Sequence, residues 1–375
     1  MLLEFKTKNY KSFVEEASFS MVAAPKQKGL DYSLMKTKIK GKEIKGLSSS
    51  VIYGPNAAGK TNIIGAMDVL RSIVLRGNIR NSEEKSSPNP AASALELIPN
   101  NNESEAKPVC FEIEFYEEDG EEHKFKIHYE LQIDLGTFLE EEYQRKILAE
   151  VLEVNGERVF ERREGLKVEN LKVIKDYLSD ITEQNAESIN EIAKNSLNQE
   201  ELFLTNGFKL IFSQKFTKLI VDWFANKFMV IYRADSMQLI KRFADPKKKA
   251  VYVKKTTDEA AKLFGINSNA VGYVVSDDEP DAKLYSVFKN MKDQKTTAVA
   301  ADIFESYGTI RFINMFPLVI KAMQTGGTLV VDEFDASIHP MALMSIINVF
   351  HNDDVNIHHA QLVFNTHNPI FLNSN

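Results

Sequence analysis

The stretch VIYGPNAAGKTNII, residues 51–64, limits the fold of this chain more than any other. It begins as an apolar run, breaks into a glycine-bounded loop and restarts as an apolar helical pattern with Lys60 and Thr61 at its start. The spacing Gly54-x4-Gly59-Lys60-Thr61 is that of the phosphate-binding loop, in which backbone N–H groups wrap phosphates between a strand and a helix. The positive end of the helix dipole adds to the same anion site. We therefore predict an α/β fold that binds a nucleotide here.

The loop pattern assigns a task to each of its residues. Lys60 is expected to reach the outer phosphates and Thr61 to hold Mg²⁺, so ATP and Mg²⁺ are the predicted cofactors. A glycine- and alanine-rich turn before a lysine-capped helix is the structural alternative, and partner motifs elsewhere in the chain argue against it. The residues predicted to bind the nucleotide in this loop are Gly54, Pro55, Asn56, Ala57, Ala58, Gly59, Lys60, Thr61 and Asn62.

Two apolar runs near the end of the sequence supply the partner motifs. GTLVVDEFDASIHP reads as a buried strand that delivers Asp332 and Glu333 to its carboxyl end. We predict that Asp332 meets Mg²⁺, directly or through water, and that Glu333 polarises the water that attacks the γ-phosphate. QLVFNTHNP reads as another buried strand, and its His367 is placed to hydrogen-bond that phosphate and sense hydrolysis. Glu333, His367 and Lys60 are therefore the predicted catalytic residues, although an acidic turn and a structural histidine would explain each run alone.

A third segment, FESYGTIRFINMFPLVIKAM, opens with Ser306-Tyr307-Gly308-Thr309 and continues as an apolar helix. Small polar residues and a glycine at a helix N-terminus form a second anion-binding surface. In isolation, a simple capped helix explains the segment better. Its apolar part is interrupted by proline and lysine and is too short to span a bilayer.

Composition places the chain among ordinary globular proteins of two or three lobes. With 375 residues, of which 43% are hydrophobic and 26% charged, it is long enough to bury a large core. The start MLLEFKTKNYKSF lacks the apolar region of a signal peptide, so we expect a cytoplasmic protein without a membrane segment. Cys110 is the only cysteine, which excludes an intramolecular disulfide and a CxxC zinc site. The net charge of −7 argues against nonspecific nucleic-acid binding by the whole surface.

Changes of pattern divide the chain into four segments. Residues 1–107 read as strands, the phosphate-loop helix and a polar loop, and make the first part of a nucleotide-binding head. Residues 108–166 alternate apolar and charged residues around an Asp-Gly and an Asn-Gly pair, which predicts hairpins of an antiparallel β lobe. Residues 167–295 have helical patterns around a strand-like FMVIYRA, so we expect an inserted helical lobe without a long coiled coil. Residues 296–375 return to the head.

In this order, the motifs resemble the ABC-type ATPase head of the RecF, SMC and OLD class. Within that class the chain is most similar to abortive-infection ATPases of the AbiL and RloA type, with relatives in the PARIS and Septu antiphage systems. The resemblance implies an α/β, P-loop ABC-type ATPase head with an antiparallel β lobe and an inserted helical lobe. The segments that carry it are MLLEFKTKNYKSF with EEASFSMVAAP, GPNAAGKTNII, ELFLTN with VDWFANKFMVI, ESYGTIRF, DEFDASIHP and QLVFNTHNPIFLN.

The resemblance also implies a homodimer that sandwiches ATP. Ser306, Gly308 and Thr309 of one subunit would cap the γ-phosphate held by the phosphate loop of the other, and Ser337 and His339 would lie at the same interface. ATP would close two heads and hydrolysis would reopen them, which would control a separate effector protein in antiphage defence. The alternatives are a RecF- or SMC-like repair or chromosome-maintenance ATPase that clamps duplex DNA, a binding module without turnover, and a transporter ATPase subunit.

The chain departs from the pattern of this class in three places. Glu305 stands where ABC signatures usually have leucine, and Gln132 and Gln144 are only candidates for the glutamine that touches the metal. The sequence ends eight residues after His367, where relatives usually continue, so a truncated chain is one interpretation. No TOPRIM-like acidic domain follows, so we expect nuclease activity to belong to a separate protein.

Two further clusters of polar residues could each be either a binding site or a solvent-exposed loop. Histidines and aspartates in HNDDVNIHHA could hold a metal, but a solvent-facing polar loop is favoured; they are His351, Asp353, Asp354, His358 and His359. A basic concentration with two aromatic residues could bind nucleic acid or an acidic partner, but a solvated charged loop is favoured. Its cations are Lys241, Arg242, Lys247, Lys248, Lys249, Lys254 and Lys255.

Overall fold

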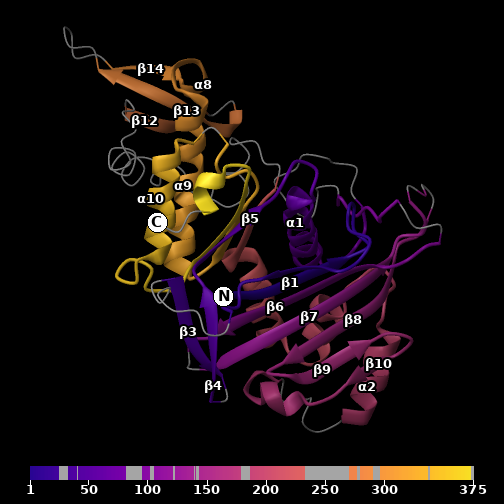
Figure 1. Ribbon diagram of the computed structural model, residues 1–375. Coiled ribbons are helices and arrows are strands. Elements are labelled where there is room, and N and C mark those ends of the chain that lie inside the picture. Colours follow the sequence, from indigo (N-terminus) through magenta and orange to yellow (C-terminus); the bar gives the residue numbers. More distant parts are fainter. Residues whose placement is uncertain are drawn as a thin grey trace.

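The protein is described by a computed structural model in which two β-sheets enclose a helix, with further helices outside them (Figure 1). The residues that the structure describes are 1–24, 33–39, 41–81, 95–101, 105–120, 123–138, 140, 143–178, 186–232, 270–276, 279–289, 296–336 and 338–372.

The predicted phosphate loop follows one strand of a four-stranded parallel sheet. Its order is β11 (Phe228–Ile231), β15 (Thr328–Val331), β16 (Gln361–Thr366) and β5 (Ser49–Tyr53). Every residue of β11, β15 and β16 is buried, because helices cover both faces of a parallel sheet. The register pairs Val331 with Ile231 on one side and with Phe364 on the other, so the residues that follow Val331 emerge at the carboxyl edge of the sheet.

A seven-stranded antiparallel sheet forms the β lobe. Its order is β10 (Leu166–Val168), β9 (Glu157–Arg162), β8 (Lys146–Val154), β7 (Lys124–Asp134), β6 (Val109–Glu118), β1 (Leu2–Lys8) and β2 (Ala17–Ser20). The two predicted hairpins are confirmed, and Asn155 and Gly156 have the positive φ values, 54° and 82°, that a type I′ turn requires. β1 and β2, assigned above to the head segment, are hydrogen-bonded into this lobe through β6.

Helix α1 (Lys60–Arg76) lies between the two sheets (Figure 1). Twelve of its 17 residues are buried, so the helix is enclosed on more than one side. Its Ile64 and Leu70 belong to one apolar core with Phe111 of the β lobe and Val330 of the parallel sheet. The helix that begins with Lys60 is therefore packed against both sheets.

Two helices cover the other face of the parallel sheet, α9 (Tyr307–Thr325) and α10 (Pro340–His351). Phe316 and Val319 of α9 pack with Leu343 of α10 and Leu329 of β15 in a second apolar core. The α/β fold class predicted from the sequence is confirmed. Among the helices of the described ranges, none is long and apolar enough to cross a membrane.

The segment 167–295 is less helical than expected. It contains the helical pieces but also β11 and the strands β12 (Ala270–Ser276) and β13 (Glu279–Lys289), which pair antiparallel with each other and with β14 (Thr296–Ala300). Valine and tyrosine in AVGYVVS favour a pleated strand once a partner strand is available, and the expectation of helix there was wrong.

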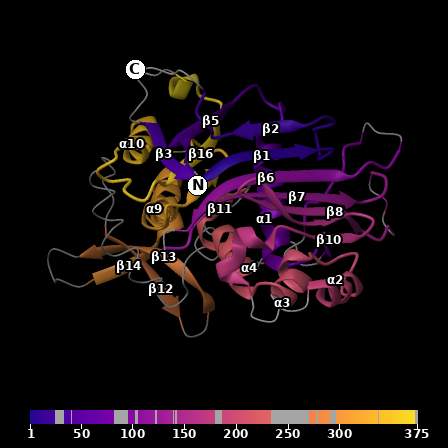
Figure 2. The same cartoon turned by 90° about the horizontal axis from the view of Figure 1, so that it is seen from below.

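The remaining described elements are short. α2 lies beside β10, and α3 and α4 continue from it towards β11 (Figure 2). The bounds of these elements are β3 Leu34–Ile39, β4 Lys42–Leu47, η2 Leu171–Tyr177, α2 Ala186–Asn195, η3 Leu204–Phe208, α3 Lys209–Ile211, α4 Gln214–Asp222, η4 Trp223–Lys227, α8 Ala301–Phe304 and η6 Pro369–Leu372.

Candidate phosphate-binding site

The predicted phosphate loop connects β5 to α1 at the carboxyl edge of the parallel sheet. Gly59 has φ 91° and Ala57 has φ 62°, so the backbone turns through the left-handed region twice before α1 begins. A Cβ on Gly59 would lie 3.0 Å from the ring of Phe13, which follows β1, so both backbone conformation and packing require glycine. The loop borders an open hollow of about 1010 Å³, lined by Tyr53, Gly54, Pro55, Asn56, Ala57, Ala58, Gly59, Lys60, Thr61, Asn62, Glu333 and His367.

Lys60 is buried within the loop rather than extended into solvent. Its Nζ donates hydrogen bonds to the carbonyl oxygens of Gly54 and Pro55, both at 2.8 Å. Phosphate oxygens would compete with these neutral carbonyls for the same protons, and a hydrogen bond between two charged groups is the stronger one. The ammonium is therefore already placed to bind an anion held by the loop.

Thr61 lines the hollow and contacts Asp332, which is buried behind it and does not line the hollow itself. The hydroxyl of Thr61 donates to Oδ1 of Asp332 at 3.1 Å, although 271 residues separate them. Asp332 is 7% exposed, and its Oδ1 also accepts a 2.6 Å bond from the amide nitrogen of Asn365. A hydroxyl and a carboxylate side by side are oxygen ligands that suit Mg²⁺, so the donor set fits the predicted metal.

Glu333 has an unusual backbone conformation. Its φ of 51° is in the left-handed region, which costs a residue with a side chain roughly 1–3 kcal/mol. Two contacts hold the segment: the Glu333 N–H donates to Oδ1 of Asn365, and its carbonyl accepts a 2.6 Å bond from Arg311 of α9. The side chain is exposed and lines the hollow, where a carboxylate can act on a bound water molecule.

His367 follows β16 and lies on the same hollow, exposed to solvent. The residue before it is fixed, because Thr366 donates a 2.5 Å hydrogen bond to Asp335 and accepts one from the N–H of Asn368. The structure therefore brings together the phosphate loop, Glu333 and His367 from three distant parts of the sequence.

The predicted signature residues lie elsewhere on the subunit. Ser306 caps α9, and its Oγ accepts from the N–H of Thr309 at 3.1 Å. Ser306, Gly308 and Thr309 do not line the phosphate-loop hollow of their own subunit. His339 caps α10 by accepting from the N–H of Met341, and Ser337 lies outside the described residues.

Sequence reasoning missed two residues that organise the site, Arg311 and Asn365. Arg311 donates to the backbone carbonyls of Asp332 and Glu333, and so connects the signature helix to the two carboxylates. Its position five residues after Ser306, near the start of the same helix, was a signal that could have been used. Asn365 could have been noticed as a buried amide two residues before His367.

Neither glutamine candidate reaches the hollow. Gln132 lies on β7 and donates to Glu130, while Gln144 borders a different cavity beside Tyr143. In the parallel sheet, β11 ends level with β15, at the edge where the site lies. Residues 233–269, which follow β11 in the sequence, lie outside the described residues.

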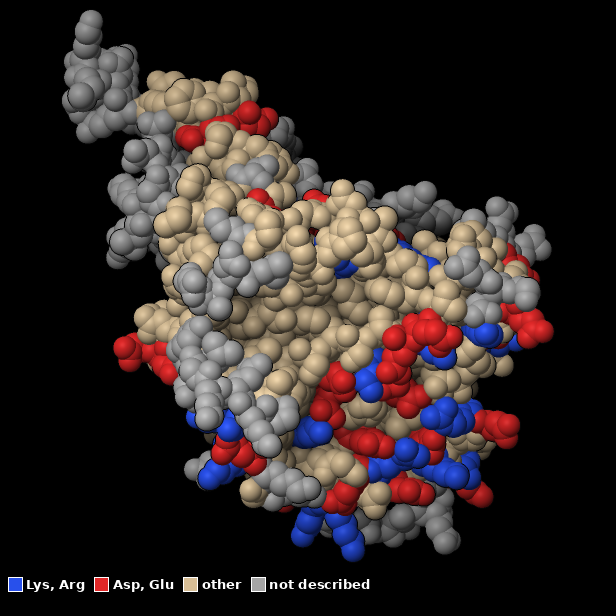
Figure 3. Space-filling view, in the orientation of Figure 1, with Lys and Arg blue, Asp and Glu red and all other residues tan. Residues whose placement is uncertain are grey.

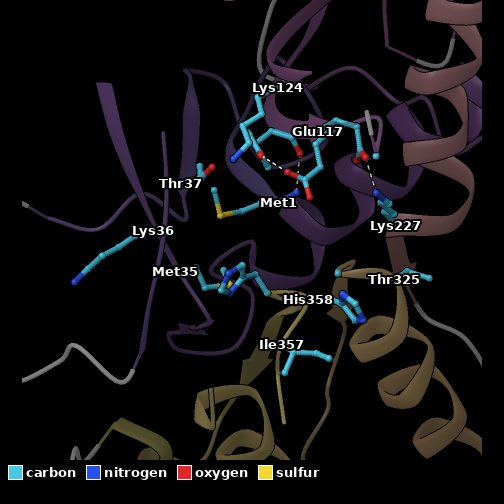
Figure 4. A pocket seen from close by; sticks show the side chains of 15 residues that line it. Met1, Met35, Lys36, Thr37, Glu117, Lys124, Lys227, Thr325, Ile357 and His358 are labelled. Carbon is cyan, nitrogen blue, oxygen red and sulfur yellow. Dashed lines mark hydrogen bonds and ion pairs between the residues drawn. The ribbon is translucent and has the colours of Figure 1, made fainter. Parts of the chain in front are cut away.

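The histidine cluster does not form a metal site. Nε2 of His351 lies 2.7 Å from the hydroxyl of Ser49, and burial lowers the pKa of His351. His358 and His359 border another cavity of about 510 Å³, together with Met35 and Lys227 (Figure 4). Within the described ranges, no group of three His, Cys, Asp or Glu residues is arranged to hold a metal ion. The basic cluster that begins at Lys241 lies outside those ranges.

Charges of both signs alternate over the antiparallel sheet (Figure 3). Lys126 pairs with Glu114 at 2.9 Å, and Arg163, which directly follows β9, pairs with Glu130 at 3.4 Å. A duplex-binding surface needs basic side chains that are not neutralised by neighbouring acids. This face of the β lobe does not have that character.

The chain matches one protein family over most of its length. The family model, described as "AAA domain, putative AbiEii toxin, Type IV TA system", matches residues 49–373. No curated protein matches the chain. Among solved structures, the SmcHead bound to the C-winged helix domain of ScpA is similar at 12% identity and a TM-score of 0.40, covering 99% of this chain and 90% of that one. The SMC head domain from Thermotoga maritima is similar at 14% identity and a TM-score of 0.34, with the same coverage.

Proposed function

Because the chain belongs to the AAA-domain family whose model matches residues 49–373, we propose that it hydrolyses ATP with Mg²⁺ and acts as a nucleotide-driven dimerisation switch. The observation that carries this proposal is the convergence of the phosphate loop, Glu333 and His367 on one hollow. A strand and a helix frame the loop, as phosphate binding requires. The reaction is the conversion of ATP and water to ADP and phosphate.

Each residue has a separate task in this reaction. Lys60 exchanges the two loop carbonyls for outer phosphate oxygens, and Thr61 and Asp332 would hold Mg²⁺, which would neutralise charge at the phosphates. Glu333 accepts a proton from the attacking water, and His367 hydrogen-bonds the γ-phosphate. His367 is exposed and lines the hollow, where it can reach a bound nucleotide. Its hydrogen bond to the γ-phosphate would be lost when phosphate leaves.

The switch depends on a second subunit. The start of α9 is exposed, and the apolar side chains Ile303, Phe304 and Tyr307 around Ser306 are 78%, 53% and 54% exposed. Apolar side chains grouped on a surface are typical of a partner contact. We propose that the partner is a second copy, whose Ser306, Gly308 and Thr309 cap the γ-phosphate, and that closure controls a separate effector in antiphage defence.

Dimer closure is tested with Glu333→Gln, which removes the general base but keeps the side-chain size. Sedimentation of this variant should show dimers with ATP and Mg²⁺ and monomers with ADP. The double variant Glu333→Gln with Ser306→Arg is the matched control, because it should bind ATP and remain monomeric. No ATP-dependent association of Glu333→Gln would refute the switch.

The effector is tested by affinity purification of Glu333→Gln with ATP and Mg²⁺ from native-host lysate, with and without nuclease treatment. A stoichiometric protein that survives nuclease treatment supports a switch that holds an effector. Duplex DNA without such a protein would instead support the repair-type clamp, which the paired charges over the β lobe do not favour.

A further inference from the structure

We propose that Asn365 is a positioning residue, which sets the orientation of the Asp332 carboxylate and the backbone of Glu333 for metal-dependent hydrolysis. The inference rests on the proposed function, because that function uses the two groups that Asn365 would position, the Asp332 carboxylate and Glu333. Asn365 itself does not line the hollow and is 1% exposed. It therefore acts through its neighbours.

The sheet register places this amide beside the two carboxylate residues. Phe364 pairs with Val331, so Asn365 is level with Asp332, where β15 has already ended. Its amide nitrogen donates to Oδ1 of Asp332 at 2.6 Å, and its amide oxygen accepts from the N–H of Glu333. Turning the amide over would oppose oxygen to carboxylate and N–H to N–H, so only one orientation satisfies both contacts.

The first contact fixes the predicted metal ligand. Oδ1 of Asp332 accepts from both Thr61 and Asn365, and within the described ranges no hydrogen bond reaches Oδ2. The Thr61 hydroxyl has lone pairs for a metal while its proton stays on Asp332, and Asn365 is the second donor that holds the carboxylate in place. Partners of this kind matter, because losing one typically weakens metal binding about 10–100-fold.

The second contact fixes the predicted general base. Glu333 keeps its left-handed φ of 51° because Asn365 holds its N–H and Arg311 holds its carbonyl. Without the amide oxygen, this strained conformation loses one of its two supports. Since His367 follows two residues later, Asn365 links the metal ligand and the general base to the strand that ends at the γ-phosphate contact.

The decisive variant is Asn365→Asp, which keeps an oxygen for the Glu333 N–H but replaces the donor to Asp332 by a second carboxylate oxygen. Binding of a fluorescent ATP analogue is measured in EDTA and across a Mg²⁺ titration. We expect the Mg²⁺ concentration for half-maximal binding to rise about tenfold or more. Binding in EDTA should stay within about twofold of the wild type, because the phosphate loop is untouched.

A second variant, Asn365→Leu, removes both contacts and is followed by amide hydrogen exchange. The Glu333 N–H should exchange faster in Asn365→Leu than in Asn365→Asp, which retains its acceptor. Gln361→Leu is the matched control, because Gln361 is an equally buried amide at the start of β16 that bonds the backbone of Leu2 and Leu47. It should lower stability and leave the Mg²⁺ dependence unchanged.

Two results would overturn the inference: a wild-type Mg²⁺ dependence in Asn365→Asp, or the same shift in Gln361→Leu. A wild-type protein without Mg²⁺-dependent nucleotide binding would instead refute the proposed function. In that case the exchange rate of the Glu333 N–H still decides about Asn365, because an unchanged rate in Asn365→Leu contradicts the positioning role.

Discussion

Asp332 and Glu150 are both buried carboxylates, but they use their oxygens differently. Oε1 of Glu150 accepts from the hydroxyl of Tyr129 and the N–H of Leu204, both at 2.9 Å, and Oε2 accepts from the N–H of Phe203 at 2.6 Å. Asp332 has hydrogen bonds to Oδ1 alone within the described ranges. Burial by itself therefore does not distinguish the two carboxylates; within the described ranges they differ in whether one oxygen is left without a hydrogen bond.

The contacts of Glu150 show the structural role of a carboxylate whose two oxygens both accept hydrogen bonds. It joins β8 to the turn that begins η3, and the neighbouring Arg162 donates to the carbonyls of Asn198 and Glu201 in the same segment. Its side chain is completely buried, and burial raises its pKa. Glu150 thus holds the helical segment on the β lobe, far in sequence from the phosphate loop.

The largest effect is expected at Lys60, the cation of the candidate site that Asp332 belongs to. Lys60→Ala removes a charged donor that contributes up to about 3 kcal/mol, so ATP affinity should fall about 100-fold or more. The unfolding free energy should change little, because the lost partners are two carbonyls near solvent. Titration calorimetry measures the affinity, and an unchanged value would sink the phosphate-loop assignment.

Asp332→Asn comes next, because it keeps the shape of the side chain and removes its charge. Loss of one preorganised electrostatic group typically lowers turnover by about 100-fold, and we expect a loss of that size here. The unfolding midpoint should stay the same or rise, since a partly satisfied buried charge is removed. If the variant instead unfolds more easily and keeps its turnover, Asp332 is a structural carboxylate like Glu150.

Glu150→Leu should show the reverse behaviour. It leaves two backbone N–H groups and the Tyr129 hydroxyl without their buried acceptor and removes the counter-charge 3.9 Å from Arg162, which costs about 3–5 kcal/mol of unfolding free energy. Turnover per folded molecule should be unchanged. Glu153→Ala on the same strand is the control, because its pairing with Arg158 is at the surface and such pairs contribute about 0–1 kcal/mol. Urea unfolding monitored by tryptophan fluorescence measures both, and equal losses would contradict the distinction.

The sequence predicts the features that a few adjacent residues encode. The glycine-containing loop between β5 and α1, the acidic end of β15, the strand before His367 and the Asn-Gly hairpin all have local patterns, and the structure contains each of these elements at the expected place. The sequence could predict that the loop, Glu333 and His367 lie together only because their three patterns match the arrangement of one known class of ATPase.

Features that depend on register and distant pairing could not be predicted in the same way. Asn365 reads as one polar residue in a buried strand, and its task follows only from the pairing of Phe364 with Val331. β1 enters the antiparallel sheet through β6, more than 100 residues later, so the division into segments could not show it. Gln132 lies on β7 of the other sheet and Gln144 borders a different cavity, whereas the strands beside β15 are β11 and β16.

The smallest expected effect is the pH dependence of the contribution of Glu150 to stability. Because burial raises the pKa of Glu150 in the folded state, its contribution to stability is complete below its ordinary pKa and is lost as pH rises through the folded value. Glu150→Gln cannot titrate, so its own loss of acceptor contacts is independent of pH. The stability advantage of the wild type over this variant should therefore shrink as pH rises from 5 to 8. Urea unfolding of both proteins at several pH values measures this difference, and an advantage that grows with pH would mean that Glu150 is stabilised as a charged group.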